Sequence, residues 1–396
     1  MFERTAANAL NRLALGFPVL TITGPRQSGK TTLAKAHFPN KPYVTLEDPE
    51  ERTLAQADPR RFLARFTQGA ILDEVQRCPD LFSYLQAVVD ERGKMADFIL
   101  TGSQQFGLMS GISQSLAGRV GLVQLLPLSH SELDKAGKLV ANAETMMCKG
   151  GYPALYQRSL SPEDWFANYI TTYIERDVRQ LVGVRDLMVF QRFVKMCAAR
   201  SGQLLNLSSL AADCGITHTT ARQWLSVLEA SYLVRLVQPY FENFGKRLVK
   251  TPKLYFLDVG LMAYLLGIRD AKTLQTHAAR GALFETMIVI EVIKHYFNQG
   301  KEAPLYFWRD AQGHEIDLLI PAQQGSENGM LQAIEVKSGT TFAMDWLDGL
   351  KKWQKMPVAS QGEQNLPWLV YGGAKSYALE SAKVLGWRDM AGALDA

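Results

Sequence analysis

Apolar and polar positions alternate in short blocks along the first 130 residues of the chain. Short apolar runs are separated by polar stretches or by apolar residues at helical spacing, a pattern that indicates strands alternating with helices. The runs that predict strands lie at 18–23, 43–47, 70–74 and 97–103, and the run at 121–129 is compatible with a fifth strand. Alternating strands and helices favour a parallel sheet covered by helices, so we expect an α/β fold here.

The pattern changes three times after residue 130. Residues 131–200 lack strand signals and contain a strongly amphipathic stretch at 165–181, which predicts a helical lid or connector. Residues 201–270 follow the order helix, tight turn, helix, strand, turn and strand, which is typical of a winged helix-turn-helix. Residues 271–396 combine a helix, a hairpin and a further strand, which predicts a second α/β domain. We therefore expect four domains, at 1–130, 131–200, 201–270 and 271–396.

A glycine-rich segment, GPRQSGKT at 24–31, connects the first predicted strand to the helix that follows it. Its spacing fits the phosphate-binding loop GxxxxGK[ST], in which glycines let backbone N–H groups converge on phosphate oxygens. We expect Lys30 to reach the β- and γ-phosphates of ATP and the Thr31 hydroxyl to ligate Mg²⁺. The alternative is a chance glycine-rich turn between a strand and a helix. The residues predicted to bind the nucleotide are Gly24, Pro25, Arg26, Gln27, Ser28, Gly29, Lys30, Thr31 and Thr32.

Two acidic residues end the third predicted strand, in the segment ILDEVQ at 71–76. Asp73 is the expected Mg²⁺ ligand, and Glu74 beside it is the expected general base that polarises the attacking water. A pair of acids at a strand end can instead serve only as a helix N-cap. Together with the glycine-rich loop, this pair predicts hydrolysis of ATP and not binding alone.

Two further polar residues are candidates for the same catalytic site. Ser103, which with Gln104 ends the fourth predicted strand, lies where a side chain can sense the γ-phosphate, and a simple turn is the alternative. Arg119 precedes the fifth apolar run and would supply positive charge to a phosphate, in its own chain or from a neighbouring subunit of a homo-oligomer. For Arg119 the alternative is a surface ion pair.

Residues 207–230 have the spacing of a helix-turn-helix. Ser208 is expected to cap the first helix, Gly215 to supply the turn, and Thr217 or Thr219 to cap the second helix. We expect the apolar residues of this unit to face a small core and the polar residues of the second helix to stay exposed. The core set is Leu225, Leu228 and Leu233, and the exposed set is His218, Thr220, Arg222 and Gln223.

Positive charge is concentrated in this part of the chain. The net charge of the whole chain is only +4, whereas residues 217–253 carry six Lys or Arg against two Asp or Glu. With a wing at 244–247 (FGKR), this basic excess suits contacts with the phosphates of double-stranded DNA. Winged helices also serve as protein-docking modules, so a protein partner is the alternative.

Carboxylates and a lysine form a second set in the last predicted domain. Asp317 lies in the strand EIDLLI, and Glu285 lies on the preceding helix. Glu335 and Lys337 are two residues apart in the strand QAIEVKSG, so they share one face of the sheet. Such carboxylates can hold a divalent metal, and the lysine can then stabilise a hydrolytic water and the developing phosphate charge. The alternative is a nuclease-like fold that only binds or supports structure.

Composition excludes several classes of protein. The 396 residues are 47% hydrophobic and 21% charged, which is ordinary for globular domains. The four cysteines form no CxxC pair and no zinc-like cluster with histidine, so structural disulfides and metal fingers are not expected. The apolar runs are far shorter than the ~18 residues of a membrane span, and the N-terminus has the pattern of an amphipathic helix rather than a signal peptide. We expect a cytoplasmic protein that does not cross a membrane.

The complete set of motifs resembles one known family. It is similar to the prokaryotic AAA-like P-loop ATPases, often called archaeal or bacterial ATPases, which carry a C-terminal domain of unassigned function. The resemblance rests on GPRQSGKT, ILDEVQ, ILTGSQ, SLAGRVGLVQLLPLS, GGYP, YIERDVRQL, YFENFGKRLVKTPKLYFLDVGL and GHEIDLLI…AIEVKSG. It implies an ATPase core, a winged helix and a restriction-endonuclease-like terminal domain. It also implies a nucleotide site with Lys30, Thr31, Asp73 and Glu74 and an endonuclease-like site with Asp317, Glu335 and Lys337.

The sequence supports one main hypothesis and two rivals. The main hypothesis is a Mg²⁺-dependent ATPase that binds ATP between core and lid and couples nucleotide state to DNA, which the terminal domain would bind or cut. The first rival is a nucleotide-dependent switch that docks a protein partner and cuts nothing. The second rival, a small-molecule kinase, is disfavoured because Glu74 beside Asp73 favours water as the acceptor.

Overall fold

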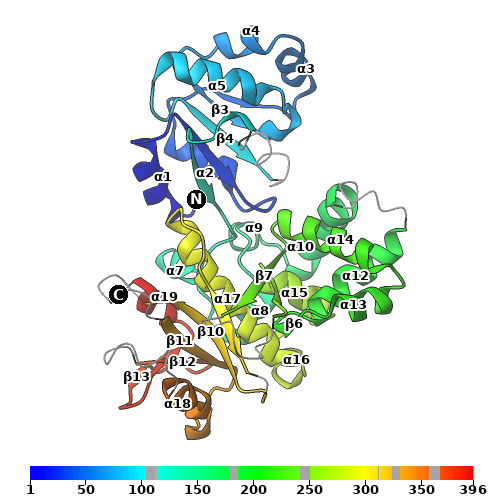
Figure 1. Cartoon of the computed structure of the whole chain (residues 1–396), viewed down its shortest axis with the longest axis vertical. Coiled ribbons are helices and arrows are strands. Elements are labelled where there is room, and N and C mark those ends of the chain that lie inside the picture. The colour runs from blue at the N-terminus through cyan, green and yellow to red at the C-terminus, as the bar shows by residue number, and fades with distance from the viewer. Residues whose placement is uncertain are drawn as a thin grey trace.

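The chain forms two β-sheets connected by helices (Figure 1). The computed structural model describes residues 1–103, 112, 114–178, 186–240, 250–310, 312–322, 331–355 and 366–395, and of residues 175–178 it describes the backbone only. Gln104 and the predicted wing at 244–247 lie outside the described residues. The first sheet lies at the top of Figure 1, the second lies near the bottom, and a group of helices lies between them and to one side.

The first sheet contains five strands, all parallel, in the order β2-β3-β4-β1-β5. The strands are β1 (Val19–Thr23), β2 (Tyr43–Thr45), β3 (Ala70–Asp73), β4 (Phe98–Gly102) and β5 (Val120–Gln124). Strands β1, β3 and β4 are buried along their whole length, which explains why their sequences are continuous apolar runs without alternation. The predicted parallel α/β sheet is confirmed.

Helices cover both faces of this sheet. They are α1 (Ala6–Ala14), α2 (Lys30–His37), α3 (Pro49–Ala57), α4 (Pro59–Ala64), the short 3-10 helix η1 (Val75–Arg77) and α5 (Leu81–Arg92). The buried side chains of α1 and α2 form a core on one face of the sheet, and those of α4 and α5 form a core on the other. Asp48 and Asp58 cap α3 and α4 by accepting hydrogen bonds from backbone N–H groups, and a proline begins each helix.

A run of helices follows the first sheet. They are α7 (His130–Lys135), α8 (Ala143–Lys149), α9 (Ala154–Gln157), α10 (Pro162–Tyr169), the π-helix η2 (Ile170–Val178) and α12 (Leu187–Ala199). Ser129 and Glu132 form a reciprocal capping box at the start of α7. The described part of 131–200 is helical and contains no strand, as the sequence pattern predicts.

Two helices, α13 (Leu207–Cys214) and α14 (His218–Ala230), meet at a tight turn. Gly215 has a φ of 70°, a left-handed conformation that favours glycine, and Thr217 caps α14 as predicted. The cap of α13 was predicted at Ser208 and is instead Asn206, whose side chain accepts a backbone hydrogen bond at 2.9 Å. The helix begins earlier than expected, so Ser208 falls within its first turn.

The second sheet contains nine strands, in the order β13-β14-β12-β11-β10-β9-β7-β8-β6. The strands are β6 (Gln203–Leu204), β7 (Val234–Pro239), β8 (Lys253–Phe256), β9 (Tyr306–Arg309), β10 (Glu315–Pro321), β11 (Leu331–Lys337), β12 (Trp368–Tyr371), β13 (Tyr377–Ala378) and β14 (Lys383–Gly386). Strands β9 and β10 form the expected hairpin, and β11 pairs antiparallel with β10. Because β7 pairs in parallel with β9, this sheet extends across the predicted domain boundary at residue 270.

A long helix, α17 (Arg280–Asn298), packs against β11 of the second sheet and also contacts β5 of the first. The other helices of this region are α15 (Val259–Leu265), α16 (Ala271–Thr276), the 3-10 helix η3 (Met344–Leu347), α18 (Asp348–Gln354) and α19 (Met390–Asp395). Most residues of α17 are buried, which explains its largely apolar sequence. Across the described residues, α17 included, no helix combines the length and apolarity needed to cross a bilayer.

Candidate functional site

The loop between β1 and α2 has the backbone geometry of a phosphate cradle. Gly24 and Gly29 have φ values of 143° and 98°, and Gln27 has a φ of 62°. A Cβ atom at Gly24 would collide with the backbone carbonyl of Leu125, so glycine is required at that position. Successive left- and right-handed residues of this kind turn backbone N–H groups toward a common centre, and the N-terminus of α2 adds its dipole.

Lys30 is the buried cation of this loop. Its side chain is largely buried, and Nζ donates hydrogen bonds to the carbonyl oxygens of Gly24 at 3.0 Å and Pro25 at 2.8 Å. Burial lowers the pKa of Lys30 to about 8, although the carboxylates of Glu74 and Asp73 oppose this shift. The net lowering of the pKa shows that burial of Lys30 outweighs these nearby charges, and phosphate oxygens would supply further negative charge.

Asp73 ends β3 beside the loop, where three hydroxyl groups donate hydrogen bonds to it. Thr31 Oγ1 lies 3.0 Å and Tyr43 OH 2.7 Å from Asp73 Oδ2, and Thr101 Oγ1 donates to Oδ1. The expected Mg²⁺ ligands Thr31 and Asp73 are therefore adjacent. A hydroxyl and a carboxylate are oxygen donors of the type that Mg²⁺ accepts, so these residues fit the ion.

Glu74 follows Asp73 in a strained conformation. Its φ of 54° is uncommon for a residue other than glycine, and such outliers cluster at active sites. Ser103 Oγ donates to Glu74 Oε2 at 3.1 Å, and Gln76 Nε2 donates to the same oxygen. The expected γ-phosphate sensor Ser103 therefore holds the expected general base in this structure.

The remaining predicted loop residues differ in their surroundings. The Arg26 guanidinium pairs with Glu47 at 3.1 Å and its carbon lies 5.7 Å from the ring centroid of Tyr173. Ser28 is fully buried, and within the described chain its hydroxyl has no hydrogen-bond partner. Thr32 lies on the first turn of α2 and lines a neighbouring cavity.

That cavity has a volume of about 190 Å³ and lies between the N-terminal segment and α2. Cavities that enclose drug-sized ligands are typically 300–1,000 Å³, so this cavity suits one part of a nucleotide, such as its base. The lining combines residues of the N-terminal segment before α1 and residues along α2 with residues after β5 and at α9. They include Phe2, Arg4, Gly29, Thr32, Leu128 and Pro153.

Arg119 is not brought to this site within its own chain. It directly precedes β5, whereas the phosphate loop follows the parallel strand β1, so the two lie at opposite ends of adjacent strands. Five strand residues at ~3.3 Å each separate these ends. Arg119 forms a two-bond ion pair with Asp90, at 2.6 and 2.8 Å, on the protein surface. The expectation of a phosphate contact in cis is therefore wrong.

Several residues that support the site were missed in the sequence. Tyr43, Thr101 and Gln76 hold the two acids, and Arg4 donates to the carbonyl of Ser28 at 2.7 Å. Only Thr101 and Gln76 lie inside quoted motifs, and nothing local marks them as contacts of Asp73 and Glu74. Arg4 and Tyr43 come from segments whose approach depends on tertiary packing.

The second predicted set of residues also comes together, at the middle of the nine-stranded sheet. Lys337 Nζ donates to Glu335 Oε1 at 2.6 Å, and the backbone N–H of Val336 donates to Asp317 Oδ2 at 2.8 Å. Glu335 is largely buried, and among described atoms its Oε2 has no hydrogen-bond partner. The predicted neighbours Asp317, Glu335 and Lys337 thus share one site.

Glu285 is held by two residues of β8 that sequence reasoning did not assign to this set. Lys253 Nζ lies 2.9 Å from Glu285 Oε1, and Tyr255 OH donates to the same oxygen at 2.6 Å. Lys253 also pairs with Glu315 and is buried. The expected metal ligand Glu285 is therefore engaged by a lysine in this structure. We call Glu285, Asp317, Glu335, Lys337 and Lys253 the acidic cluster.

Burial and charge shift the pKa values in the acidic cluster. Burial, together with the carboxylates of Glu335 and Glu285, raises the pKa of Asp317 well above its usual value. Burial also raises the pKa of Glu335, against the opposing charge of Lys337. Carboxylates that repel one another in a buried place are stabilised by a cation. As the side chains stand, no group of three or more His, Cys, Asp or Glu in the described ranges is arranged to hold a metal ion.

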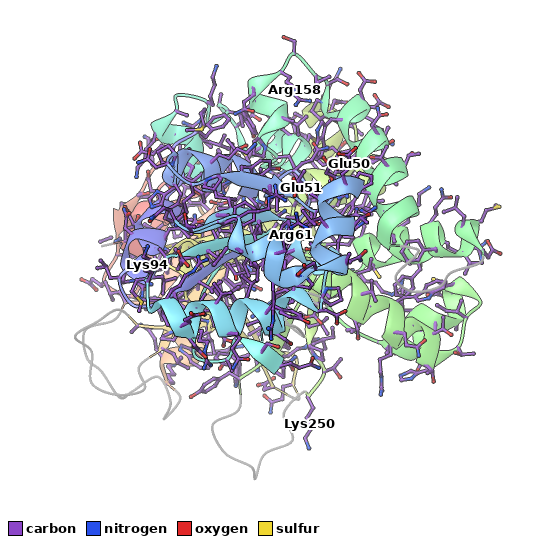
Figure 2. All side chains as sticks on the ribbon, turned by 90° about the horizontal axis from the view of Figure 1, so that it is seen from above. Glu50, Glu51, Arg61, Lys94, Arg158 and Lys250 are labelled. Carbon is purple, nitrogen blue, oxygen red and sulfur yellow. The ribbon has the colours of Figure 1, made fainter. Side chains whose placement is uncertain are left out.

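The polar face of α14 is open to solvent. Arg222 and Gln223 are exposed together with His218, while Thr220 is half-buried. The predicted core residues Leu225, Leu228 and Leu233 are buried. Lys250, which precedes β8, is also exposed and points away from the body of the protein in Figure 2.

Comparison with known protein families agrees with the first of these sites. Residues 16–134 match the model of an AAA domain, and residues 140–272 and 280–390 match two domains of unknown function, DUF8612 and DUF4143. The AAA match covers the part of the chain that contains the parallel sheet and the loop at 24–31, so residues 16–134 form an AAA-like P-loop domain.

Two mycobacterial proteins are similar to most of the chain. They are the uncharacterized proteins Mb2031c of Mycobacterium bovis and Rv2008c of Mycobacterium tuberculosis. Each is 37% identical over 324 residues, which is 80% of this chain and 71% of the relative. The chain belongs to the same family as these two proteins.

Solved structures show more distant similarity. The Walker-type ATPase PABY2304 of Pyrococcus abyssi aligns with 67% of this chain and 96% of its own, at 15% identity and a TM-score of 0.40. The Holliday junction branch migration motor RuvB of Thermotoga maritima aligns with 58% of this chain and 88% of its own, at 20% identity and a TM-score of 0.32.

The lowered pKa of Lys30 generates a test of the phosphate loop. Without nucleotide, Lys30 loses its proton as the pH rises through about 8. Bound phosphates favour the ammonium form, so binding raises this pKa and takes up a proton. We expect net proton uptake on ATP binding above that pH and little uptake well below it, measured by calorimetry in buffers of different ionisation enthalpy.

The matched control is Lys30→Arg, because arginine stays charged throughout this range. The variant should bind ATP without the uptake seen above pH 8. Equal uptake in the wild type and in Lys30→Arg would show that the proton enters another group.

Proposed function

We propose that this protein is a cytoplasmic, Mg²⁺-dependent ATPase that couples its nucleotide state to double-stranded DNA. One observation supports the ATPase part most strongly. Asp73 and Glu74 lie at the end of β3 beside the loop at 24–31, with Asp73 bonded to Thr31 and Glu74 bonded to Ser103. This arrangement supports the proposal because the expected metal ligands Thr31 and Asp73 are adjacent to each other and a second carboxylate, Glu74, directly follows Asp73 in the chain.

Each residue has a separate role in the proposed hydrolysis. Lys30 would exchange its carbonyl partners for phosphate oxygens, and Thr31 with Asp73 would hold Mg²⁺, which neutralises charge on the phosphates. Glu74 would accept a proton from the attacking water. Ser103 and Gln76 both donate to Oε2 of Glu74, and in the proposed mechanism Oε1 would orient the water.

Glu74→Gln tests the proposed general base. The amide keeps the shape of the side chain and removes its basicity, so we expect ATP binding to persist while turnover falls about 10²- to 10⁴-fold. The measurement is phosphate release under saturating ATP, together with a nucleotide-binding titration. Glu50→Gln is the control, because Glu50 is exposed on α3 and its labelled side chain lies on the outer face of the first domain in Figure 2. Unchanged turnover in Glu74→Gln would contradict the role.

The second part of the proposal concerns α13, α14, β7 and β8, which we interpret as a winged-helix unit that binds DNA. Support comes from the exposed face of α14, where Arg222 and Gln223 are side chains that commonly contact phosphates and bases. Lys250 adds a further exposed cation from the segment before β8. Binding through such contacts releases counterions and therefore weakens as salt rises.

Arg222→Ala tests the DNA contact. Loss of one phosphate contact reduces the slope of log affinity against log salt concentration by about 0.9, and we expect weaker binding of duplex DNA at every salt concentration. Arg61→Ala is the matched control, because Arg61 is an exposed arginine on α4, at the top of Figure 1 and away from α14. An affinity for duplex DNA that does not change with salt concentration would contradict DNA binding and favour docking of a protein partner. An equal loss of DNA affinity in Arg222→Ala and Arg61→Ala would do the same.

The third part of the proposal is that residues 271–396 form a restriction-endonuclease-like domain. Asp317, Glu335 and Lys337 share one site on β10 and β11, and Glu335 has a buried oxygen left unbonded among the described atoms. That oxygen and Asp317 fit a divalent cation, although Lys337 now occupies the other oxygen of Glu335. A bound cation would activate water and offset the charge of a DNA phosphate.

Asp317→Asn and Lys337→Met test this site. We expect Mn²⁺- or Mg²⁺-dependent nicking of plasmid DNA by the wild type and about a 10²-fold or greater loss in either variant. Asp345→Asn, an exposed carboxylate on η3, is the control. Nicking that survives both substitutions would assign the activity to a contaminant, and absence of nicking in the wild type would leave this domain a binding module.

Arg119 has a place in the proposal only if the protein forms a homo-oligomer. It is paired with Asp90 at the end of the first sheet where β5 begins, which is opposite the end that carries the phosphate loop. From this position it would complete the site of a neighbouring copy by releasing Asp90 and approaching the γ-phosphate.

A further inference from the structure

The turn between α14 and β7 places a tyrosine against the base of the phosphate loop. Tyr232 is buried, and its hydroxyl oxygen lies 2.7 Å from Thr23 Oγ1 and 3.2 Å from Gln124 Nε2. Thr23 and Gln124 are the last residues of β1 and β5 and are paired in register. A single hydroxyl group thus bridges the two strand ends that lie directly before the loop.

The backbone of Tyr232 is strained. Its φ of 56° lies in the left-handed region, and its N–H donates to the carbonyl of Glu229 at 3.0 Å, so it ends α14 where glycine is the usual residue. The left-handed conformation is energetically unfavourable for tyrosine, and residues in such conformations persist only where contacts with the surrounding structure hold them there. What tyrosine adds here is the hydroxyl that bonds β1 and β5.

A second contact connects the same turn to the loop. Tyr173 of the π-helix η2 donates from its hydroxyl to the carbonyl of Ser231 at 3.4 Å. The guanidinium carbon of Arg26 lies 5.7 Å from the centroid of the Tyr173 ring. Residues 231–232 therefore contact residues 23–26 in two ways, once directly and once through an aromatic ring.

The turn continues into rigid elements on both sides. It ends α14, the helix with the exposed Arg222, and it leads into β7, which pairs with β8 and β9 in the nine-stranded sheet. Rigid elements joined by hydrogen bonds carry coupling between distant sites when one end is displaced. A change at Thr23 has a short structural route to α14 through Tyr232.

We propose that Tyr232 is a positioning residue that transmits occupancy of the phosphate loop to α14 and β7. The inference rests on the proposed function, because it requires ATP to bind in the loop, but it does not require DNA. Phosphates would draw Lys30 away from the carbonyls of Gly24 and Pro25. The loop backbone next to Thr23 then adjusts, and the Thr23–Tyr232 hydrogen bond passes this adjustment to the end of α14.

Hydrogen exchange of the full chain, with and without the ATP analogue AMP-PNP and Mg²⁺, tests the route. In the wild type we expect the exchange rates of amides in 226–238 to change at least about fivefold on binding, the low end of ordinary coupling between sites. Tyr232→Phe keeps the buried ring and removes only the hydroxyl. It should bind AMP-PNP with affinity within about twofold of the wild type, while the exchange response in 226–238 falls below about twofold.

Two further variants make the test decisive. Tyr371→Phe is the control, because it removes a buried tyrosine hydroxyl that bonds Lys375 in the second sheet and should keep the full response. Thr23→Val removes the other partner of the Tyr232 bond with little change of shape. It should lose the response as Tyr232→Phe does, and it decides the matter if Tyr232→Phe fails to fold.

The outcomes separate the two claims. Failure of the wild type to bind AMP-PNP would overturn the proposed function and this inference with it. Binding by the wild type without any response in 226–238 would overturn the inference alone. A full response in Tyr232→Phe, or in Thr23→Val, would overturn it equally.

Discussion

Two buried ion pairs fix the segment at 126–132, where the chain leaves the first sheet. Arg4 pairs with Glu132 at 3.0 Å and donates to a carbonyl of this segment at 2.7 Å. Lys294 of α17 pairs with Glu291 at 2.8 Å and donates to another carbonyl of the segment at 2.8 Å. All four side chains are largely buried. Removing one partner of a buried pair costs roughly 3–5 kcal/mol, because the other charge stays buried without compensation. The relative placement of the ATPase core and the second sheet depends on these pairs.

The nucleotide site depends on the same junction. Arg4 also donates to the carbonyl of Ser28, so the side chain that fixes the exit from β5 also fixes the phosphate loop. The hydroxyl of Tyr232 then connects the ends of β1 and β5 to the turn after α14. The loop is therefore held from outside its own motif by residues on either side of it in the chain. A loop held in this way is connected to the rest of the molecule by contacts at both of its ends.

The first sheet, the phosphate loop and the two acids beside it were predictable because they depend on local spacing in the sequence. The buried parallel strands appear as apolar runs, and GPRQSGKT followed by ILDEVQ predicts a loop and a pair of acids that the structure does bring together. The contacts that the sequence did not predict correctly depend on positions along strands and on distances across the fold. Arg119 precedes β5, and only the parallel register of β5 with β1 shows that it lies at the wrong end of the sheet. The contact of Ser103 with Glu74 was not predicted, because the distance between the two residues is set by packing of β3 against β4. The contacts of Lys253 and Tyr232 were missed because their partners lie more than 30 residues away in the chain, and the quoted motif that contains Lys253 gives no sign of its contact with Glu285.

The central claim is that the loop at 24–31 binds ATP for hydrolysis, with Lys30 as its cation. The most direct measurement is the rate of phosphate release from ATP in the presence of Mg²⁺, compared between the wild type and Lys30→Ala. We expect the wild type to release phosphate and Lys30→Ala to lose both tight nucleotide binding and turnover, because a buried cation of the loop is gone. Binding and hydrolysis that remain intact in Lys30→Ala would contradict the claim.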